Sequence, residues 1–478
     1  MMSTVKSSST SSAPRYTIAD APLTWRHWWI AVVASLGQMI GTMVATVAGV
    51  IIPLMALTST YAHMSSLVQG LIGAADLIGI MVGSMVFGRL SDRYGYLPFF
   101  RFCPALVLVA SLVAVFVPNV WVLIISLFVV GFGIGGEYSL DSDYTSELMP
   151  ARYQLLMLGI VKSGAAFGNI LGAGISFLLV AGWSNPANWP QLMWTIAVVA
   201  AIMLLSRIYF FESPKWLLCH GKKTKAVIAL HRFLGSSVGF SAAELNPQPQ
   251  QSAAGQSVQS PSRLGFFSFC RRYWDKVVLS GIPWSCEGLG VYGIGVFIPI
   301  LVMALGIEHQ SASATAIAGV ASSVKTTMWI SCIILPGFLI GVWLASHRVR
   351  EVRLQSVCFW ACAASLLILL FSYHLKWPVW ISLISFMAFE LFLNIGPHLV
   401  TYLLPPRIYP VEVRGQGTGI AAAIGKAGAV AGVFLVPLLL KAGGGVLVLA
   451  FSAVIMAIGA IVTGIYGRRV EKLSDTKI

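Results

Sequence analysis

Long apolar stretches separated by short polar ones dominate the chain. Twelve of them hold about 20 residues or more, and each can cross a hydrocarbon core of about 30 Å as a helix. These segments are 28–57, 65–88, 99–117, 119–142, 154–180, 190–211, 277–304, 312–344, 354–374, 377–403, 415–440 and 443–466. Strands of a membrane β-barrel would be shorter and alternating, so the pattern predicts an all-α membrane protein.

A long polar interruption at 212–275 divides the twelve segments into two sets of six. The sequence therefore predicts an N-terminal six-helix bundle at 28–211 and a C-terminal six-helix bundle at 276–466. The interruption predicts a cytoplasmic loop of amphipathic helices followed by a flexible linker rich in Pro, Gln and Ser. We expect cytoplasmic tails at 1–27 and 467–478, the Ser-rich first one being disordered.

Composition and charge support a membrane protein. The chain is 57% hydrophobic and 10% charged, against about 25% charged in soluble proteins. The net charge is +14, and its basic residues follow the positive-inside rule of membrane proteins. The loops expected outside, near 58–64, 181–189 and 305–311, contain no Lys or Arg. We expect a multi-pass protein of a cell inner (plasma) membrane, with both termini cytoplasmic and no nucleic-acid partner. No stretch resembles a cleaved signal peptide.

No constellation of residues indicates catalysis. The sequence contains no nucleotide-binding loop and no catalytic-triad signature, and its seven Cys lack metal-ligand spacing. We therefore expect no enzyme activity, no catalytic residue and no metal. We also expect no cofactor, with a proton gradient as the driving force for transport.

The two halves carry similar sequences. KSGAAFG at 162–168 matches KAGAVAG at 426–432, and each follows a turn that holds an acidic residue, Pro and Arg. A duplicated six-helix unit predicts a substrate site at mid-membrane between the halves and alternating access by rocking. Gly and Ala at these positions can equally serve ordinary helix packing.

Ten ionisable side chains are expected to lie within the membrane, where such residues normally face the bundle interior or a water-filled cavity. They are Asp76, Glu137, Asp141, Asp143, Lys162, Glu287, Lys325, Glu390, His398 and Lys426. Glu137 and Asp141 are four residues apart and share a helix face, where closeness and burial favour protonation of one acid. Lys162 and Lys426 would neutralise these acids or bind an anionic substrate. The alternative is a set of buried ion pairs that only orient helices.

Several motifs resemble those of the major facilitator superfamily. GRLSDRYGY at 88–96 is similar to its loop signature G-x-L-[SA]-D-[RK]-x-G, and FESPKWLL and YPVEVRG resemble its sugar-porter branch. GIGGEYSL at 133–140 and NIGPHLVTYLLPPRIYPVEVRGQGTGIAAAIGKAGAVAG at 394–432 resemble its phosphate:proton symporter branch. The resemblance covers both halves. It implies two six-helix bundles with a central cytoplasmic loop, a fold that needs no oligomer to function.

The second resemblance also implies roles for single residues. The expected substrate-binding set is Lys426, Asn394, Tyr138, Trp284, Tyr292 and Lys162, the last of these from its place in the repeat. The expected proton-coupling set is Glu137, Asp141 and Glu287. The chain departs from that branch in its seventh helix, where Gly288 replaces an acid and Glu287 stands next to it. It departs again in the first helix, which has no acid, and at His398, which replaces an Asn.

A further set of charged residues lies at the inner ends of predicted helices. By resemblance they form salt bridges that latch the outward-facing state: Asp92, Arg93, Glu147, Arg152, Glu412 and Arg414. The alternative is solvated loop charges, each of which contributes little to stability.

Together these features predict a secondary active transporter that takes up a small anionic metabolite, such as an organic acid, by proton-coupled symport with alternating access. Its partners would be that substrate, protons and the lipid bilayer. A proton-coupled or facilitative transporter of a neutral sugar or polyol, or an exporter, would suit the same fold. A membrane receptor or sensor that binds without transport is the alternative of another class.

Overall fold

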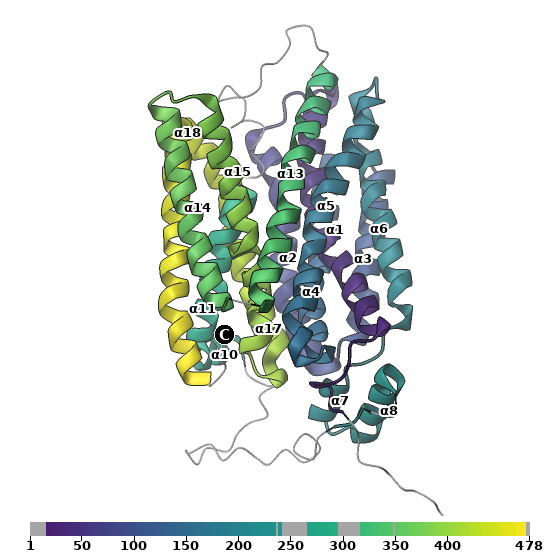
Figure 1. Cartoon of the computed structure of the whole chain (residues 1–478). Coiled ribbons are helices and arrows are strands. Elements are labelled where there is room, and N and C mark those ends of the chain that lie inside the picture. The colour runs from purple at the N-terminus through teal and green to yellow at the C-terminus, as the bar shows by residue number, and fades with distance from the viewer. Residues whose placement is uncertain (1–15, 236–237, 241–264, 295–315, 348, 475–478) are drawn as a thin grey trace, which may run out of the picture.

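The structure, a computed structural model, describes residues 16–235, 238–240, 265–294, 316–347 and 349–474, and these are almost wholly helical. Within those ranges, ten helical segments are long and apolar enough to cross a membrane. The long helices run side by side along one common direction (Figure 1).

Helices of the first 211 residues agree in position with the first six predicted segments. They are α1 (Trp25–Ala56), α2 (Ser66–Tyr94), α3 (Leu97–Phe116), α4 (Val120–Leu148), α5 (Gln154–Ala181) and α6 (Met193–Ser206), joined by the 3₁₀ turns η1 (Ser59–Tyr61), η2 (Ala151–Tyr153), η3 (Pro186–Leu192) and η4 (Arg207–Tyr209). Both α2 and α4 continue beyond their apolar segments. As a result, Asp92 and Glu147 lie on helices and not on loops.

The remaining described residues form a polar connection and a second set of long helices. They comprise α7 (Pro214–Cys219), α8 (Lys223–Leu234), α10 (Phe266–Arg272), α11 (Trp274–Gly288), the π-helical turn η6 (Leu289–Ile294), α13 (Ala316–His347), α14 (Glu351–His374), α15 (Val379–Ile395), α16 (Pro397–Leu403), α17 (Pro405–Ile408), η7 (Val411–Val413) and α18 (Arg414–Ser474). The long α18 contains two helices that meet at the non-helical residues Gly443 and Gly444, where the sequence predicts a boundary between segments.

The expected disordered tail at 1–27 differs from the structure over its last part, while residues 1–15 lie outside the described ranges. Residues 16–24 pack against the protein: Tyr16 forms a β-bridge with Val238, and Ile18 is buried. The short stretch YTIADAPL carries enough apolar side chains to bury, which the Ser-rich residues before it do not.

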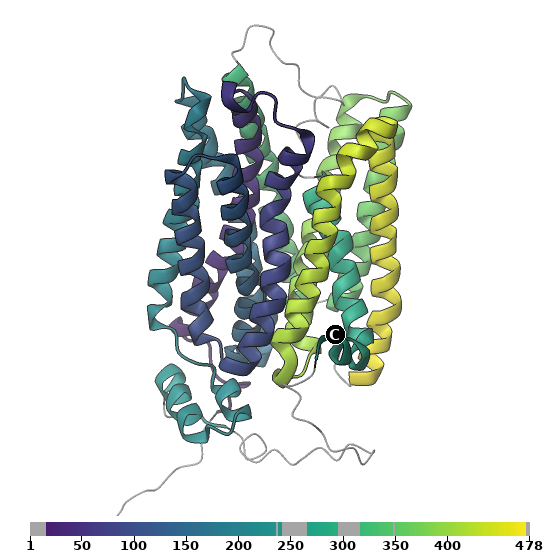
Figure 2. The same ribbon diagram turned by 180° about the vertical axis from the view of Figure 1, so that it is seen from behind.

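Helices α1 to α6 lie on one side of the molecule, and α14, α15 and α18 lie on the other (Figures 1 and 2). Between them, α13 packs against α5 and α15. The short helices α7, α8 and α10 all lie at the same end of the molecule, which we call the α8 end, with α7 and α8 below the first set of helices and α10 below α11 (Figure 1). The C-terminal end of α18 lies there too (Figure 1). So does the start of α1, where Arg26 Nη1 donates to the Phe233 carbonyl oxygen at 2.7 Å.

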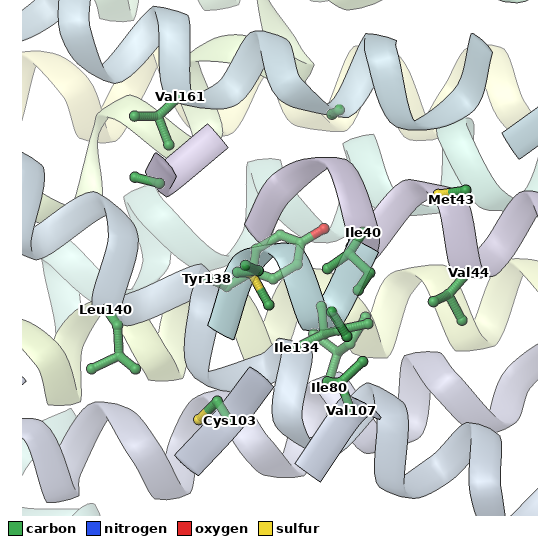
Figure 3. Close-up of a cluster of buried hydrophobic side chains, with 14 of the residues drawn as sticks. Ile40, Met43, Val44, Ile80, Cys103, Val107, Ile134, Tyr138, Leu140 and Val161 are labelled. Atoms are coloured by element: carbon green, nitrogen blue, oxygen red, sulfur yellow. The ribbon is translucent and has the colours of Figure 1, made fainter. Parts of the chain in front are cut away.

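Apolar side chains of several helices surround Tyr138 of α4. Ile40 of α1 and Ile134 of α4 lie beside its ring (Figure 3). All three side chains are fully or almost fully buried. This packing fixes the position of the one aromatic ring around which the polar groups of the core gather.

Glycines allow α2 and α18 to cross with their backbones in contact. A Cβ atom on Gly88 would lie 2.2 Å from the backbone oxygen of Gly415, and one on Gly419 would lie 2.2 Å from that of Ser84. Only hydrogen fits at these positions, so two segments distant in sequence are held together by small residues.

The variant Gly88→Ala should be less stable than the wild type, because its methyl group collides with the α18 backbone. We expect the free energy of unfolding to fall by about 1–3 kcal/mol, measured as loss of helical circular dichroism on heating in detergent. Gly49→Ala is the matched control, since no atom lies within 4 Å of its added Cβ. It should be neutral or slightly stabilising, and equal losses in both variants would contradict the tight crossing.

Candidate functional site

Two lysines lie at the centre of the helix packing. Lys162 of α5 is 1% exposed and Lys426 of α18 is 2% exposed. Both amines approach the ring of Tyr138, with Nζ atoms 5.5 Å and 4.7 Å from its centroid. Lys162 Nζ is also 5.4 Å from the centroid of the Tyr402 ring. Aromatic faces attract cations, most strongly where water is excluded, so the rings partly compensate two buried positive charges.

The small residues of the repeat allow the two lysines to lie this deep. A Cβ atom on Gly425, next to Lys426, would lie 2.6 Å from Cγ of Trp284 in α11. Similarly, a Cβ atom on Gly164 would lie 2.2 Å from the backbone oxygen of Ser35 in α1. At each of these glycines, close to one of the lysines, the helix therefore lies directly against a neighbouring helix.

Trp284 brings the second set of helices to the same place. Its ring is 2% exposed, and the centroids of the Trp284 and Tyr138 rings are 6.1 Å apart at an interplanar angle of 44°. Tyr292, expected in the same pocket, lies in η6, and its side chain falls outside the described part of the structure. Trp284 thus adjoins the aromatic ring that both amines approach.

A break in the predicted helix 377–403 shapes the next part of the site. Helix α15 ends at Ile395, Gly396 has the non-helical angles φ −116° and ψ −80°, and Pro397 begins α16. Proline is tolerated in the first turn of a helix and not in its interior. The sequence analysis treated this segment as one helix because its apolar pattern is continuous across the break.

Asn394 and His398, on either side of that break, are joined to Glu287 of α11. His398 Nδ1 lies 3.0 Å from Asn394 Oδ1, and His398 Nε2 lies 3.7 Å from Glu287 Oε1. Glu287 also interacts electrostatically with Lys162 and Lys426. The structure therefore brings four of the predicted site residues together, and it adds His398.

A second buried charge cluster lies between α4 and the end of α6. Arg207 Nη1 is 2.5 Å from Glu137 Oε2, and Arg207 Nη2 donates to Asp141 Oδ1 at 2.7 Å. All three side chains are 0% exposed. The two acids share one helix face, and their counter-charge is Arg207, not Lys162 or Lys426 as the sequence analysis suggested.

Arg207 was not predicted as a site residue, because it lies near the inner end of the segment 190–211 and resembles the many basic residues at helix ends. Its side chain instead lies against the ring of Phe100, with Cζ 4.8 Å from the centroid. Helix α1 contributes no acid to this cluster, but its Gly37 leaves room for the cluster. A Cβ atom on Gly37 would lie 2.1 Å from Asp141 Oδ2, so the cluster fills the volume that a side chain at Gly37 would occupy.

Three of the six predicted latch residues meet at the α8 end. Asp92 of α2 accepts hydrogen bonds from the backbone N–H groups of Gly415 at 2.9 Å and Gln416 at 2.7 Å. A carboxylate at the start of α18 satisfies donors that have no partner within the helix and interacts well with its dipole. Arg414 Nη1 lies 3.4 Å from Glu147 Oε1, so α18 is joined to α4 as well.

Further polar contacts support this junction. Thr418 of α18 donates to Asp143 Oδ1 at 2.9 Å, a contact the sequence analysis did not assign. The carboxylate of Glu212, next to α7, accepts hydrogen bonds from the backbone N–H groups of Tyr96, Leu97 and Ser213. Burial raises the pKa of Glu212, an effect that these three donors partly offset.

The other three predicted latch residues, Arg93, Arg152 and Glu412, are exposed. Arg93 and Arg152 lie over the rings of Tyr94 and Tyr153, at 5.2 Å and 5.5 Å from the centroids. In the part of the chain that the structure describes, no ion pair joins any of the three to another residue. The structure therefore shows no salt bridge for these three residues in this conformation, where their side chains are exposed to the surroundings.

Metal binding has no support among the described residues, which contain no group of three or more His, Cys, Asp or Glu side chains that could hold an ion. Several ionisable residues of the core approach one another or aromatic rings. The site is thus one of charge and hydrogen bonding, with positive and negative groups from α4, α5, α11, α15, α16 and α18.

Comparison with known proteins gives relatives that match most of the chain. The inner membrane metabolite transport protein YgcS of Escherichia coli (strain K12) is 25% identical over 414 residues, which cover 86% of this chain and 85% of the relative. The inorganic phosphate transporter PHO84 of Saccharomyces cerevisiae is 24% identical over 397 residues, which cover 76% and 67%.

A solved structure shares the fold. The proton:xylose symporter XylE of E. coli, bound to 6-bromo-6-deoxy-D-glucose, matches with a TM-score of 0.73 at 17% identity, over 93% of this chain and 95% of XylE. The model of the sugar (and other) transporter family matches residues 3–467. This family consists of transporters and not of enzymes, and its members are multi-pass membrane proteins. The chain belongs to the sugar (and other) transporter family of the major facilitator superfamily.

Proposed function

We propose that this transporter takes up a small anionic metabolite together with protons, by alternating access. The observation that carries the proposal is the pair of buried amines, Lys162 and Lys426, beside the Tyr138 ring. Placing a lysine at the centre of a membrane costs roughly 3 kcal/mol of free energy on insertion scales. We therefore expect each of these lysines to have a function that offsets this cost. Binding an anion supplies that role, because a negative ligand between two positive amines removes much of the cost.

The proposed architecture has twelve membrane-spanning helices in two bundles of six. Ten candidate spans are described, and one of them, α18, contains two helices that meet at Gly443. Helix α11 with η6 would supply the beginning of the twelfth. The α8 end would be cytoplasmic, since exposed basic side chains gather there: Lys222, Lys223, Lys225, Arg232, Arg271, Arg272, Arg468 and Arg469.

The substrate would lie between the lysines and the residues around them. Trp284 and Tyr138 would hold its apolar part, and Asn394 would help to orient it. The name of the relative PHO84, an inorganic phosphate transporter, agrees with an anionic substrate. We favour an organic acid, because the two aromatic rings offer more apolar surface than phosphate alone would use.

Glu137 and Asp141 would carry the transported proton in the first half. One guanidinium faces two carboxylates, so the buried cluster has one negative charge in excess until a proton joins it. Such a cluster gains from protonation when it is buried and releases the proton when water or a cation reaches it. The proton gradient would then drive uptake, and no bound cofactor is needed.

A neutral sugar is the second candidate, favoured by one observation. Trp284 and Tyr138 adjoin each other at 6.1 Å, and the fold neighbour XylE is named as a proton:xylose symporter. A sugar would stack on the aromatic rings, but it would bring no negative charge to the two lysines. For this reason we place it second.

Uptake into proteoliposomes tests the substrate and the role of Lys426 together. Radiolabelled organic anions, phosphate and sugars are supplied with and without an inward proton gradient. We expect gradient-driven uptake of an anion, reduced at least roughly tenfold by Lys426→Gln, a loss of about 1.4 kcal/mol. The matched control is Lys441→Gln, an exposed lysine further along α18 that should retain full uptake. Gradient-independent flux of a neutral sugar, unaffected by Lys426→Gln, would overturn the proposal.

Asp92 should hold the α8 end closed, because its carboxylate binds two backbone N–H groups at the start of α18. A hydrogen bond to a charged group contributes about 1.5–3 kcal/mol, so Asp92→Ala should move the equilibrium roughly tenfold or more towards the open α8 end. Distances between spin labels at exposed Arg101 and Arg468, in a cysteine-free background, report the change. The control Arg93→Ala alters the exposed neighbour and should leave the distances unchanged; a similar shift in both variants would contradict the latch.

Arg207 should stabilise the protein only because two acids face it. Replacing it by Met leaves Glu137 and Asp141 buried without a counter-charge, at a cost of about 3–5 kcal/mol. Removing both charges as well, in the triple variant with Glu137→Gln and Asp141→Asn, should restore most of the stability and reduce the proton dependence of uptake. Thermal unfolding in detergent gives the comparison. If the triple variant is no more stable than Arg207→Met, the guanidinium acts through packing and not through charge.

A further inference from the structure

The contact between Glu287 and His398 is a second pair of titratable groups, separate from the cluster around Arg207. Glu287 comes from α11 and His398 from α16, and they are 2% and 4% exposed. His398 Nε2 lies 3.7 Å from Glu287 Oε1, within the range of an ion pair and longer than a hydrogen bond. Phe338 of α13 lies against the imidazole, with ring centroids 5.1 Å apart, and shields this side of the pair from water.

Asn394 determines which nitrogen of His398 carries hydrogen. Its Nδ2 donates to the backbone oxygen of Glu390 at 2.8 Å, and only the amide nitrogen can donate to a carbonyl group. The orientation of the amide is thereby fixed, and Asn394 Oδ1, an acceptor, faces His398 Nδ1 at 3.0 Å. Nδ1 must therefore be the donor, and in the neutral imidazole Nε2 is left as an acceptor.

Two acceptors then face each other if no further proton is present. The lone pair of Nε2 points towards a carboxylate, and Glu287 Oε1 has no hydrogen-bond partner among the described residues. A buried acceptor without a donor costs about 1–3 kcal/mol, and more when it is charged. One added proton, on either Nε2 or Oε1, turns the repulsion into a charged pair or a hydrogen bond.

We propose that Glu287 and His398 share one dissociable proton and form a proton-binding pair within the substrate site. This inference rests on the proposed proton-coupled transport of an anion and adds a coupling residue, His398. Sharing needs no other reactant: the proton joins Nε2 or Oε1 from water when the site is open, and it leaves by the same route.

The surrounding charges connect this proton to the anion. Lys162 on α5 and Lys426 on α18 interact electrostatically with both members of the pair. Further buried titratable side chains on the helices around the pair include Cys286 on α11, Cys358 on α14, Glu390 on α15 and Tyr402 on α16. An anion bound by the lysines would offset their positive field and strengthen proton binding. By linkage, the proton would strengthen anion binding equally, which is the condition for symport.

Infrared difference spectroscopy tests the pair without any substrate. Protein reconstituted in lipid is titrated with acid, and the bands of protonated carboxyl groups and of isotope-labelled histidine rings are followed. In the wild type, beside the bands of the other carboxyl groups and histidines, we expect one carboxyl band and one imidazole band that change with a common midpoint. Glu287→Gln should remove the carboxyl band. His398→Gln should remove the imidazole band and move the midpoint of Glu287 to lower pH by about one unit or more, a tenfold loss of proton affinity.

His374→Gln is the matched control, because His374 is an exposed histidine at the end of α14 and should leave both bands unchanged. A Glu287 midpoint that is the same in His398→Gln and in the wild type would overturn the proposal. The wild-type titration decides the question even if a variant fails to fold, since separate midpoints for the two bands would also overturn it. Because no substrate is present, this result is independent of whether the transported solute proves to be an anion.

Discussion

The need to compensate buried charge governs the centre of this protein. Water is excluded from the packed helices, so a charged side chain there must meet an opposite charge, a hydrogen-bond partner or an aromatic face. Two positive amines share the face of Tyr138, and one guanidinium lies between two carboxylates. The amines also interact electrostatically with Glu287, and the single positive charge of the guanidinium faces two carboxylates. Under the proposed function, an anion would bind at the amines and a proton at the carboxylates.

Close helix packing makes these arrangements possible. At Gly425 and Gly164 the backbone of one helix touches its neighbour, which brings each lysine to the aromatic residues at the centre. Glycine also joins α2 to α18 at the α8 end, beside the hydrogen bonds of Asp92. Close contact between helices at glycines is therefore found both at the site and at the closed α8 end. Motion of one set of helices against the other would alter both at once, as alternating access requires.

Much of the fold follows from the apolar pattern, and the predicted boundary at 440–443 coincides with the break at Gly443 and Gly444. The site was less predictable. Lys162, Lys426, Tyr138 and Trp284 do lie together, as their motifs suggested, but Arg207 was not among the predicted site residues. Whether a basic residue at a helix end turns inward depends on which acids its neighbours present, and that is a property of the packed helices.

The sequence by itself determined that the chain crosses a membrane many times and that charged residues lie inside its helices, because hydropathy and length are properties of each segment alone. The tertiary structure decided which charges meet. It paired Arg207 with Glu137 and Asp141, placed His398 against Glu287, and turned Arg93 outwards beside the buried Asp92. Such choices depend on contacts between segments far apart in the chain, and no local pattern of residues encodes the distance between two helices.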